Sequence, residues 1–427
     1  MSDNLAELSK SLAEDLHTES MWDWELLPPE ILIQSLSLLP IKTLITCTSV
    51  SKTWKSIIQN PTFISNHLHL SNNNNNNNLF LFRLYSKELL KATRNFEIDE
   101  DGTELYKLYW DNNNKEDFNE HTSFDFPFHG ESFSGVFDVV GTYNGLFCLT
   151  DDVFGTYNGL FCLTDDVFSH SYSFILWNPC VRKFVKLPPP NVSRKTHGLC
   201  IESTGFGFDA KTNDYKVVRF VTLENAGRIG EFPPEVEVYS LAIGEWRMVT
   251  ALAPIGDVCG PARQAFINGA LHSIALKKVA NNKLIHFVMV FDLGDEVFCE
   301  MELPKFLEED VYWAPPAISA YGNSLALFRE TVRALNIWVM KEYADASSWT
   351  KIYTFAVPRF GYHAPRPIAF RRSGEVILEN LREQLVSCDL ESQKIKDLGI
   401  AGYGFTFSGS YVESLVLLDK PNRAVTY

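Results

Sequence analysis

The sequence predicts a mainly β protein in which a small all-α domain of three to four short helices precedes a large β-propeller. Two observations predict this architecture. Residues 26–70 space their apolar side chains with the period of helices, whereas short apolar runs alternate with turn residues from Val136 onward. The β pattern also recurs about every fifty residues, which is the period of kelch-like propeller blades.

The composition divides the chain into four parts. Residues 1–25 are a polar, acidic and flexible leader, and residues 26–70 are the helical domain. Residues 71–78 contain a run of asparagines and are expected to be a linker, because such a tract buries no surface. Residues 79–427 form the β-domain, whose first fifty residues or so are the hardest to assign to strands.

The first helix is expected to start at Pro28 and Pro29, since the missing N–H groups of proline cost nothing in a first turn. It should end before Pro40. Between these prolines lies one apolar stripe, formed by Ile31, Leu32, Leu36 and Leu39.

Two or three further helices should follow. Lys42 to Thr48 predicts a second short helix, and Ser51 is a suitable N-cap for a third that ends at Asn60-Pro61. Thr62 to His67 adds one or two more turns. Helices this short bury little surface on their own, so a partner or a neighbouring domain is expected to cover part of their apolar side chains.

The repeating unit of the β-domain is an apolar run, a turn, and a second run that in most copies opens with an aromatic residue. The five copies are Phe174 to Trp177 with Phe184, Val236 to Leu241 with Trp246, Phe287 to Phe291 with Phe298, Leu335 to Met340 with Trp349, and Leu385 to Leu390 with Ile395. A glycine-containing hairpin signal precedes most of them, at Asn158-Gly159, Gly207-Phe208, Asn268-Gly269, Gly322-Asn323 and Ser373-Gly374. Together the two patterns predict a four-stranded blade. A pair of β-sandwiches with similar hairpins is the alternative, and the blade number stays open.

One segment is duplicated without a single difference. GTYNGLFCLTDDVF occupies residues 141–154 and again residues 155–168. One copy is expected to form a blade strand, and the other to be looped out or added as an extra hairpin.

The charge and the motifs exclude several functions. The 427-residue chain carries a formal net charge of −15, which would repel a nucleic acid backbone or an anionic membrane, so the expected partner is a protein. No signal peptide or membrane-spanning stretch is visible, and the eight cysteines show no disulfide or zinc spacing, so the expected location is the cytoplasm or the nucleus.

The minimal parts of an enzyme are also missing from the sequence. It has no Gly-x-Ser-x-Gly elbow, phosphate-binding loop or His-Glu-x-x-His, so we predict a non-enzyme without catalytic, cofactor-binding or metal-binding residues. His67-x-His69 would place two imidazoles on one face of a strand, but no further ligand is near, and we interpret the pair as ordinary polar positions.

Aromatic residues in the loops between blades are the predicted target-binding positions, because such residues dominate protein interfaces. These are Phe232, Tyr312, Trp313, Phe360 and Tyr362. Packing beneath their own loops is an equal alternative.

The helical segment resembles the F-box. The resemblance is carried by Leu27, Pro28, Glu30, Ile31, Leu32, Leu36, Leu39, Pro40, Leu44, Val50, Ser51, Lys52 and Trp54. The segment departs from plant F-boxes at Thr46, Cys47 and Thr48, where basic and aromatic residues are usual, so the strength of adaptor binding stays open. The β-domain resembles the F-box-associated domain of plant F-box proteins, including S-locus F-box and F-box/kelch-repeat proteins, through stretches such as NGLFCL, LWNPCVRKFVKLP and YVESLV.

The resemblance implies a substrate-recognition subunit of a Skp-cullin-F-box ubiquitin ligase. The β-domain would hold an unknown target protein, and the cullin scaffold would be reached indirectly. The Skp-type adaptor would dock on Leu27, Pro28, Ile31, Leu36, Leu39, Pro40, Leu44, Val50 and Trp54. The alternative is a propeller enzyme or a lectin-like binding protein whose helical N-terminus is only a cap.

Overall fold

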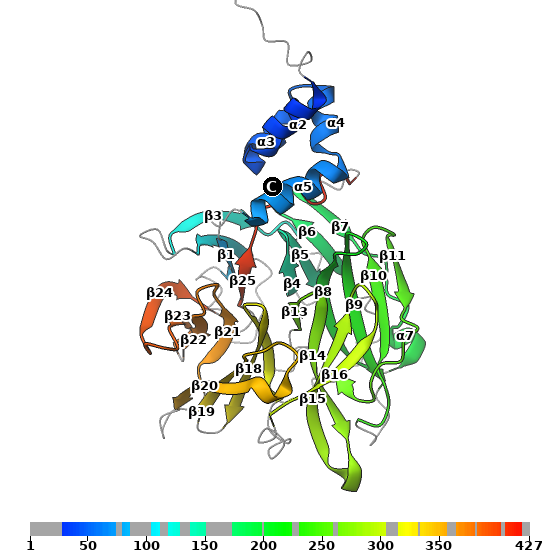
Figure 1. Ribbon diagram of the computed structural model, residues 1–427, viewed down its shortest axis with the longest axis vertical. Helices are drawn as coiled ribbons and strands as arrows, with labels where there is room; N and C mark the ends of the chain where they lie inside the picture. Colours follow the sequence, from blue (N-terminus) through cyan, green and yellow to red (C-terminus); the bar gives the residue numbers. More distant parts are fainter. Residues whose placement is uncertain are drawn as a thin grey trace, which may run out of the picture. The chain divides into compact units, whose positions relative to one another are not determined.

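The computed structural model divides the chain into two compact units, Met1–Asn73 and Asn74–Tyr427, which are helical and β respectively (Figure 1). It describes residues 28–73, 79–85, 104–111, 118–128, 137–150, 173–198, 200–223, 230–258, 264–304, 315–331, 334–356, 364–380, 382–402 and 406–420.

The described part of the first unit contains four helices, which confirms the predicted helical domain. They are α2 (Pro29–Ser37), α3 (Ile41–Cys47), α4 (Lys52–Ile58) and α5 (Pro61–Asn73). Pro29 begins α2, as predicted, and the Ser51 side chain caps α4 by accepting a hydrogen bond of 3.1 Å from the Trp54 amide. Helix α5 runs to Asn73, three residues into the predicted linker, because nothing in Ser71 or the asparagines that follow forces a helix to stop.

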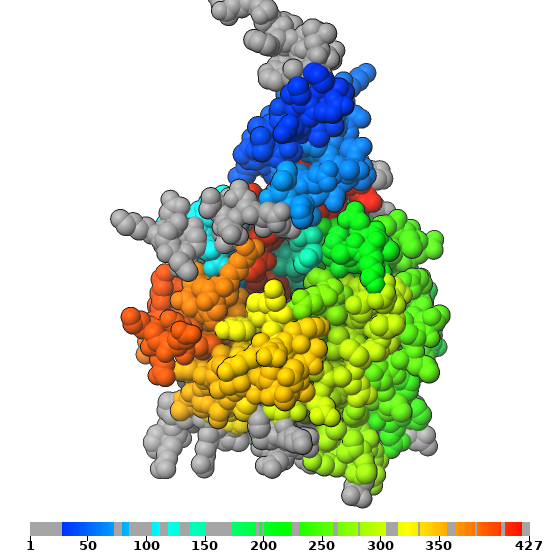
Figure 2. Space-filling model, in the orientation of Figure 1, coloured from blue at the N-terminus to red at the C-terminus, as the bar shows by residue number. Residues whose placement is uncertain are grey.

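The core of the helical unit lies on one side of each helix. Leu32 and Leu36 of α2, Leu44 of α3 and Ile58 of α4 are buried. Helix α5 contacts α2, and its buried His67 donates a hydrogen bond of 3.1 Å from Nε2 to the carbonyl oxygen of Leu39. Figure 2 shows these helices in blue as one compact body.

The second unit contains six antiparallel sheets among its described residues, and each sheet is one blade. Blade 1 consists of β25 (Phe407–Tyr411), β1 (Leu79–Tyr85), β2 (Glu104–Trp110) and β3 (Glu120–Asp125). Blade 2 consists of β4 (Asp138–Tyr143), β5 (Leu146–Thr150), β6 (Phe174–Asn178) and β7 (Lys183–Lys186). Blade 3 consists of β8 (Cys200–Asp209), β9 (Asp214–Leu223), β10 (Glu235–Ser240) and β11 (Glu245–Met248), and the short helix α7 (Arg194–His197) precedes it.

The remaining three blades repeat this plan. Blade 4 consists of β12 (Asp257–Val258), β13 (Ala265–Ile267), β14 (Ala270–Lys278), β15 (Leu284–Asp292) and β16 (Phe298–Glu302), with the 3-10 turn η4 (Ala280–Asn282). Blade 5 consists of β17 (Ala317–Tyr321), β18 (Ser324–Thr331), β19 (Ala334–Met340) and β20 (Trp349–Ala356), with η6 (Ala346–Ser348). Blade 6 consists of β21 (Arg366–Phe370), β22 (Val376–Glu379), β23 (Gln384–Cys388) and β24 (Ile395–Ala401).

The innermost strands of the blades form a closed ring. Each contacts the innermost strand of the next blade, in the order β25, β4, β8, β13, β17, β21 and back to β25. A pair of sandwiches has no such ring, so the fold is the predicted β-propeller, and it has six blades. The apolar side chains between neighbouring sheets make up its core.

Blade 1 closes the ring, because its strands come from both ends of the domain. Strand β1 pairs on one side with β2 and on the other with β25, with Leu79 opposite Tyr411 and Arg83 opposite Phe407. The region after Leu79, which was hard to assign from the sequence, thus supplies three of the four strands of this blade.

The predicted repeat matches the outer strands of the blades. Its five copies correspond to β6–β7, β10–β11, β15–β16, β19–β20 and β23–β24. Asn268-Gly269, Gly322-Asn323 and Ser373-Gly374 lie in the β13–β14, β17–β18 and β21–β22 turns respectively. The Gly207-Phe208 prediction was wrong, since both residues lie inside β8, where Gly207 gives room to the Phe266 ring, and the turn follows at residues 210–213.

The first copy of the duplicated segment is in the sheet. It forms the end of β4 and all of β5, joined at Asn144-Gly145. The second copy, with Asn158-Gly159, lies outside the described residues.

The two ends of the propeller differ in their connections. Because strands alternate in direction within a blade, the turns between strands one and two and between strands three and four lie at one end, which we call the turn end. The connections between strands two and three, and those from one blade to the next, lie at the opposite end, which we call the loop end. Turn-end connections such as residues 144–145 and 268–269 are short, whereas the loop-end connection formed by residues 249–256 is longer. The chain enters the propeller at Leu79, at the turn end.

Candidate protein-binding surfaces

The predicted adaptor-binding residues divide into buried and exposed groups. Leu36 and Leu44 are buried in the core of the helical unit, and Leu39 and Trp54 are half-buried. Pro28, Ile31, Pro40 and Val50 are exposed, and Leu27 lies outside the described residues. The first helix is therefore two-sided, since part of its predicted apolar stripe holds the fold and Ile31 remains open to a partner.

Three exposed apolar residues of the helical unit were not predicted as binding positions. They are Ile33, Leu38 and Leu70. One signal in the sequence could have indicated Leu38, namely the unbroken apolar pair that it forms with Leu39 before Pro40. A helical stripe holds only one of these two leucines, so the other has to face outward.

Thr46, Cys47 and Thr48, at which the chain departs from plant F-boxes, have side chains that are hydrogen-bonded or buried within the helical unit. The Thr46 hydroxyl donates to the Lys42 carbonyl oxygen at 3.1 Å, and the Thr48 hydroxyl donates to the Ile45 carbonyl oxygen at 2.6 Å. Cys47 is buried. These three residues therefore offer a partner no charged or aromatic group.

The two histidines singled out from the sequence do not share a face. Both lie in helix α5 and not in a strand. In a helix, two side chains that are two residues apart point about 200° away from each other. His67 is buried and His69 is exposed. Burial lowers the pKa of His67, and its hydrogen bond to the Leu39 carbonyl oxygen opposes this shift. His67 thus ties α5 to the connection between α2 and α3.

One of the five predicted target-binding residues lies in the described part of the chain. Phe232 is exposed at the loop end of blade 3, between β9 and β10. Tyr312, Trp313, Phe360 and Tyr362 lie outside the described residues.

Phe232 has exposed apolar neighbours that the sequence did not reveal. Its carbonyl oxygen accepts a hydrogen bond of 3.1 Å from the Gly256 amide, which ties the β9–β10 connection to the segment after β11. That segment carries Ile255 and Leu252, which are 53% and 89% exposed. We call Phe232, Leu252 and Ile255 the blade 3 patch.

Paired charges and backbone bonds hold the blade 3 patch in place. Glu231 forms an ion pair of 2.8 Å with Lys278 of blade 4, and the Gly230 amide donates to Asp257 at 2.9 Å. Burial raises the pKa of Asp257, and the Gly230 hydrogen bond opposes the shift. The patch therefore rests on a fixed loop, although its own side chains are open to solvent.

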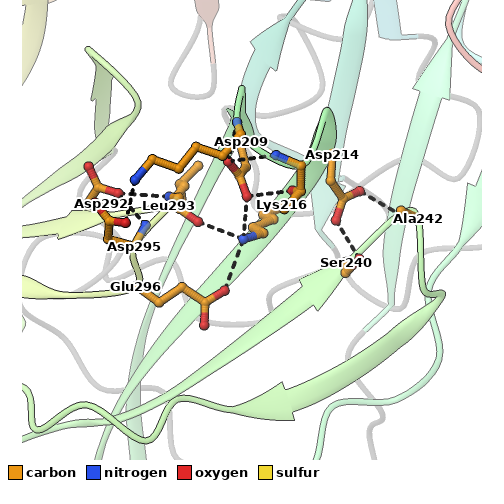
Figure 3. A network of polar contacts seen from close by, with 12 residues as sticks. Asp209, Asp214, Lys216, Ser240, Ala242, Asp292, Leu293, Asp295 and Glu296 are labelled. Atoms are coloured by element: carbon orange, nitrogen blue, oxygen red, sulfur yellow. Dashed lines mark hydrogen bonds and ion pairs between the residues drawn. The ribbon is translucent and has the colours of Figure 1, made fainter. Parts of the chain in front are cut away.

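One network of buried charges joins blades 3 and 4. The Lys216 ammonium of blade 3 lies between Asp209, at 2.9 Å, and Glu296 of blade 4, at 3.0 Å, and also donates to the Leu293 carbonyl oxygen at 2.7 Å (Figure 3). Each of these charged groups has a protein partner, which leaves the network no free group for chemistry. We assign it to the stability of the boundary between blades 3 and 4.

The described residues meet neither the requirements of a metal centre nor those of a membrane-spanning helix. Within the described ranges, no group of three or more His, Cys, Asp or Glu side chains could hold a metal ion. None of the described helices has the length and apolar character needed to cross a bilayer.

Three family-like stretches that are far apart in the sequence meet at the turn end. Asn178, of LWNPCVRKFVKLP, donates to the carbonyl oxygens of Ser414 and Val416, which both belong to YVESLV. The Tyr411 hydroxyl donates to the carbonyl oxygen of Gly145, in NGLFCL, at 3.3 Å. These stretches therefore form the closure of the propeller.

Comparisons with known proteins agree with this architecture. The F-box domain family matches residues 24–66, and the F-box associated beta propeller domain family matches residues 150–416, which is more than half of the chain. F-box protein CPR1 of Arabidopsis thaliana is 26% identical over 417 residues, covering 92% of this chain and 89% of the relative.

Two other relatives from the same plant have similar lengths of match. F-box protein At4g22390 is 26% identical over 413 residues, covering 91% of this chain and 90% of the relative. F-box/kelch-repeat protein At3g23880 is 24% identical over 353 residues, covering 79% of this chain and 82% of the relative.

The two matched domains define the general role. An F-box implies binding of a Skp-type adaptor, and its combination with a propeller supports a substrate-adaptor role in Skp-cullin-F-box ligases. Such proteins are typically substrate receptors and not enzymes. The chain therefore belongs to the family of F-box proteins that carry an F-box associated β-propeller domain.

Proposed function

We propose that this chain is the substrate-receptor subunit of a Skp-cullin-F-box ubiquitin ligase. The helical unit docks the Skp-type adaptor, and the loop end of the propeller holds the target protein. The observation that carries the proposal is the exposure of Pro28, Ile31, Pro40 and Val50, because apolar side chains open to water on a small helical unit await a partner. The proposal includes a cytoplasmic or nuclear location, which fractionation of the tagged full chain would test.

In this role the protein carries out no bond chemistry itself. The adaptor and the cullin bring the conjugating enzyme, and the propeller brings the target. Tethering raises the effective concentration of the target lysine to the millimolar range, and the reaction rate follows from this proximity.

Adaptor binding is tested with the purified full chain and a plant Skp-type adaptor. The triple variant Ile31→Ala/Pro40→Ala/Val50→Ala removes exposed apolar groups and leaves the buried Leu36 and Leu44 in place. We expect its affinity to fall by about a hundredfold, at about 1.4 kcal/mol for each factor of ten. Equal affinity of the wild type and this variant would contradict the proposed docking residues.

A matched control separates loss of docking from general loss of exposed apolar surface. Leu252→Ala removes a leucine that is 89% exposed, but it does so in the propeller. We expect this variant to bind the adaptor like the wild type. A wild-type chain that binds no adaptor would remove the proposed function altogether.

The blade 3 patch is the described surface that we propose for the target. Its three side chains are exposed and lie on loops fixed by backbone and ion-pair contacts, so binding orders little additional chain. Proximity labelling in cells, with residues 24–66 deleted to prevent degradation, would identify the target. Phe232→Ala/Ile255→Ala should then reduce labelling of that target, and unchanged labelling would place its binding elsewhere.

A further inference from the structure

Helix α2 has an exposed apolar side in addition to its buried one. Of the residues on this exposed side, only Ile31 is among the docking residues proposed so far. Leu32 and Leu36 are buried, whereas Ile31 and Leu38 are 49% and 78% exposed. Ile31 and Leu38 are seven residues apart, which is about two helical turns, so they share one side of the helix. Leu38 keeps a helical backbone, with φ −88° and ψ −9°, so this geometry extends to its position.

The surface between Ile31 and Leu38 is uncharged. Gln34 and Ser35 lie between the two along this side of the helix. The Ser35 hydroxyl donates to the Ile31 carbonyl oxygen at 2.8 Å, so it does not compete for an outside partner. A partner seated here meets an apolar and electrically neutral stripe.

This stripe continues into the proposed docking residues. Leu38 lies two residues before the exposed Pro40, and the whole stripe lies inside the matched F-box segment, residues 24–66. Leu38 therefore lies in the chain between two of the residues proposed above to dock the adaptor, Ile31 and Pro40. Among the described residues, Leu38 is one of the most exposed large apolar side chains.

We infer that Leu38 is an anchor residue for the Skp-type adaptor, on a stripe formed by Ile31 and Leu38. This inference rests on the proposed function. It also fits the local bonding of Thr46 and Thr48, because α3 offers the adaptor no charged group there and α2 has to supply apolar contact instead.

The test measures the affinity of the full chain for a purified plant Skp-type adaptor by calorimetry. Leu38→Ala should weaken binding about tenfold, as expected for the loss of one well-covered leucine side chain. Leu38→Met keeps an apolar side chain of similar volume and should stay within about threefold of the wild type. Circular dichroism should be unchanged, since Leu38 makes no part of the core.

The matched control is Ile33→Ala on the same helix. Ile33 is 41% exposed, but it lies five residues from Leu38 and thus about 140° round the helix. We expect less than a twofold change in affinity. An equal loss in both variants would overturn the assignment, because the effect would then not belong to the Ile31 and Leu38 side.

The remaining outcomes distinguish this inference from the proposed function. If the wild type binds the adaptor and Leu38→Ala binds it equally well, the inference is wrong and the function stands. If the wild type binds no adaptor, both are wrong. A Leu38→Ala variant that changes only the sedimentation of the chain, from dimer to monomer, would assign the stripe to a second copy. A difference that appears only after residues 1–25 are deleted would assign it to that segment, and either result overturns the inference.

Discussion

Asn178 donates a hydrogen bond of 2.8 Å to the carbonyl oxygen of Val416, which lies 238 residues later in the chain. The same amide donates to the Ser414 carbonyl oxygen at 3.1 Å, and Asn178 is fully buried. One side chain of blade 2 thus satisfies two backbone groups of the segment that follows the closing strand β25.

We predict that Asn178→Ala destabilises the propeller by about 2 to 4 kcal/mol, because it leaves buried carbonyl oxygens without donors. Denaturant unfolding measured by tryptophan fluorescence would show the change. Asn268→Ala is the matched control, since its amide donates to the Asn323 carbonyl oxygen at 3.2 Å in an exposed turn. A loss no larger than that of the control would contradict the role of Asn178.

Truncation after Tyr411 should prevent the propeller from closing stably. It removes Leu415, Val416, Leu417 and Leu418, which are buried, and it also removes the carbonyl oxygens that accept from Lys183. We expect loss of cooperative unfolding and increased protease sensitivity. A truncation after Lys420 keeps all these contacts, and similar behaviour of the two truncations would refute the prediction.

Gly145 is required at the turn between β4 and β5. Its φ is +75°, and an added Cβ would lie 2.5 Å from the Val412 carbonyl oxygen. Gly145→Ala should therefore cost about 2 to 4 kcal/mol in unfolding free energy, from backbone strain and from displacement of the closing segment. Gly269→Ala has a similar φ of +79° with open space around the Cβ, so it should cost about 1 kcal/mol. Equal costs would mean that the contact with Val412 is unimportant.

Removal of the buried Lys216 ammonium should lower the stability of the propeller. Lys216→Met leaves Asp209 buried without its charged partner and should cost about 3 to 5 kcal/mol. Lys211→Met breaks the ion pair with Asp295, in which both side chains are 60% exposed, and should leave the unfolding midpoint unchanged. Indistinguishable midpoints of the two variants would show that the network is not stabilising.

The propeller should lose stability as the pH falls from about 6.5 to about 4. Burial lowers the pKa of both His272 and His286 to about 4, and the charge of Arg329 adds to the shift of His286. Burial is the cause of the pKa shift at His272, and the hydrogen bond from its Nδ1–H to the Ala265 carbonyl oxygen opposes it, while its Nε2 accepts from the Tyr343 hydroxyl at 3.0 Å.

The sign follows from proton binding. Between pH 6.5 and 4 the unfolded chain binds protons at these histidines and the folded chain does not, so the stability decreases by about 1 to 3 kcal/mol per histidine. His272→Gln/His286→Gln should flatten this dependence in denaturant unfolding at a series of pH values. His197→Gln, at an exposed position of α7, should leave it unchanged. A slope that survives the double substitution would assign the acid sensitivity to other groups.

Sequence reasoning succeeded where the signal was local. The cap at Ser51, the proline start of α2 and the aromatic openings of β7, β11, β16 and β20 each depend on residues a few positions apart. It failed where the deciding partner is distant. A glycine is needed at position 207 because the Phe266 ring packs against it, and Asn178 stabilises the fold by its hydrogen bond to Val416. Both partners are distant in the sequence, so neighbouring residues do not reveal them.

The candidate binding surfaces, like the fold, were predicted where the signal is local and missed where the partner residue is distant in the sequence. The F-box segment identified the helices, but spacing alone could not separate the inward Leu36 from the outward Ile31 and Leu38. For the propeller, Phe232 was predicted from its loop. Leu252 and Ile255 became neighbours of Phe232 only through the backbone bond from Gly256.

The pairing of β1 with β25 has a consequence for synthesis in the cell. Strand β1 leaves the ribosome early, whereas its second neighbour emerges more than three hundred residues later. Until then β1 presents an unpaired edge, which is a site for mispairing and for chaperone binding. A nascent or prematurely terminated chain therefore remains an open ring and a target of quality control, and only a chain that reaches Lys420 gains the complete, closed domain.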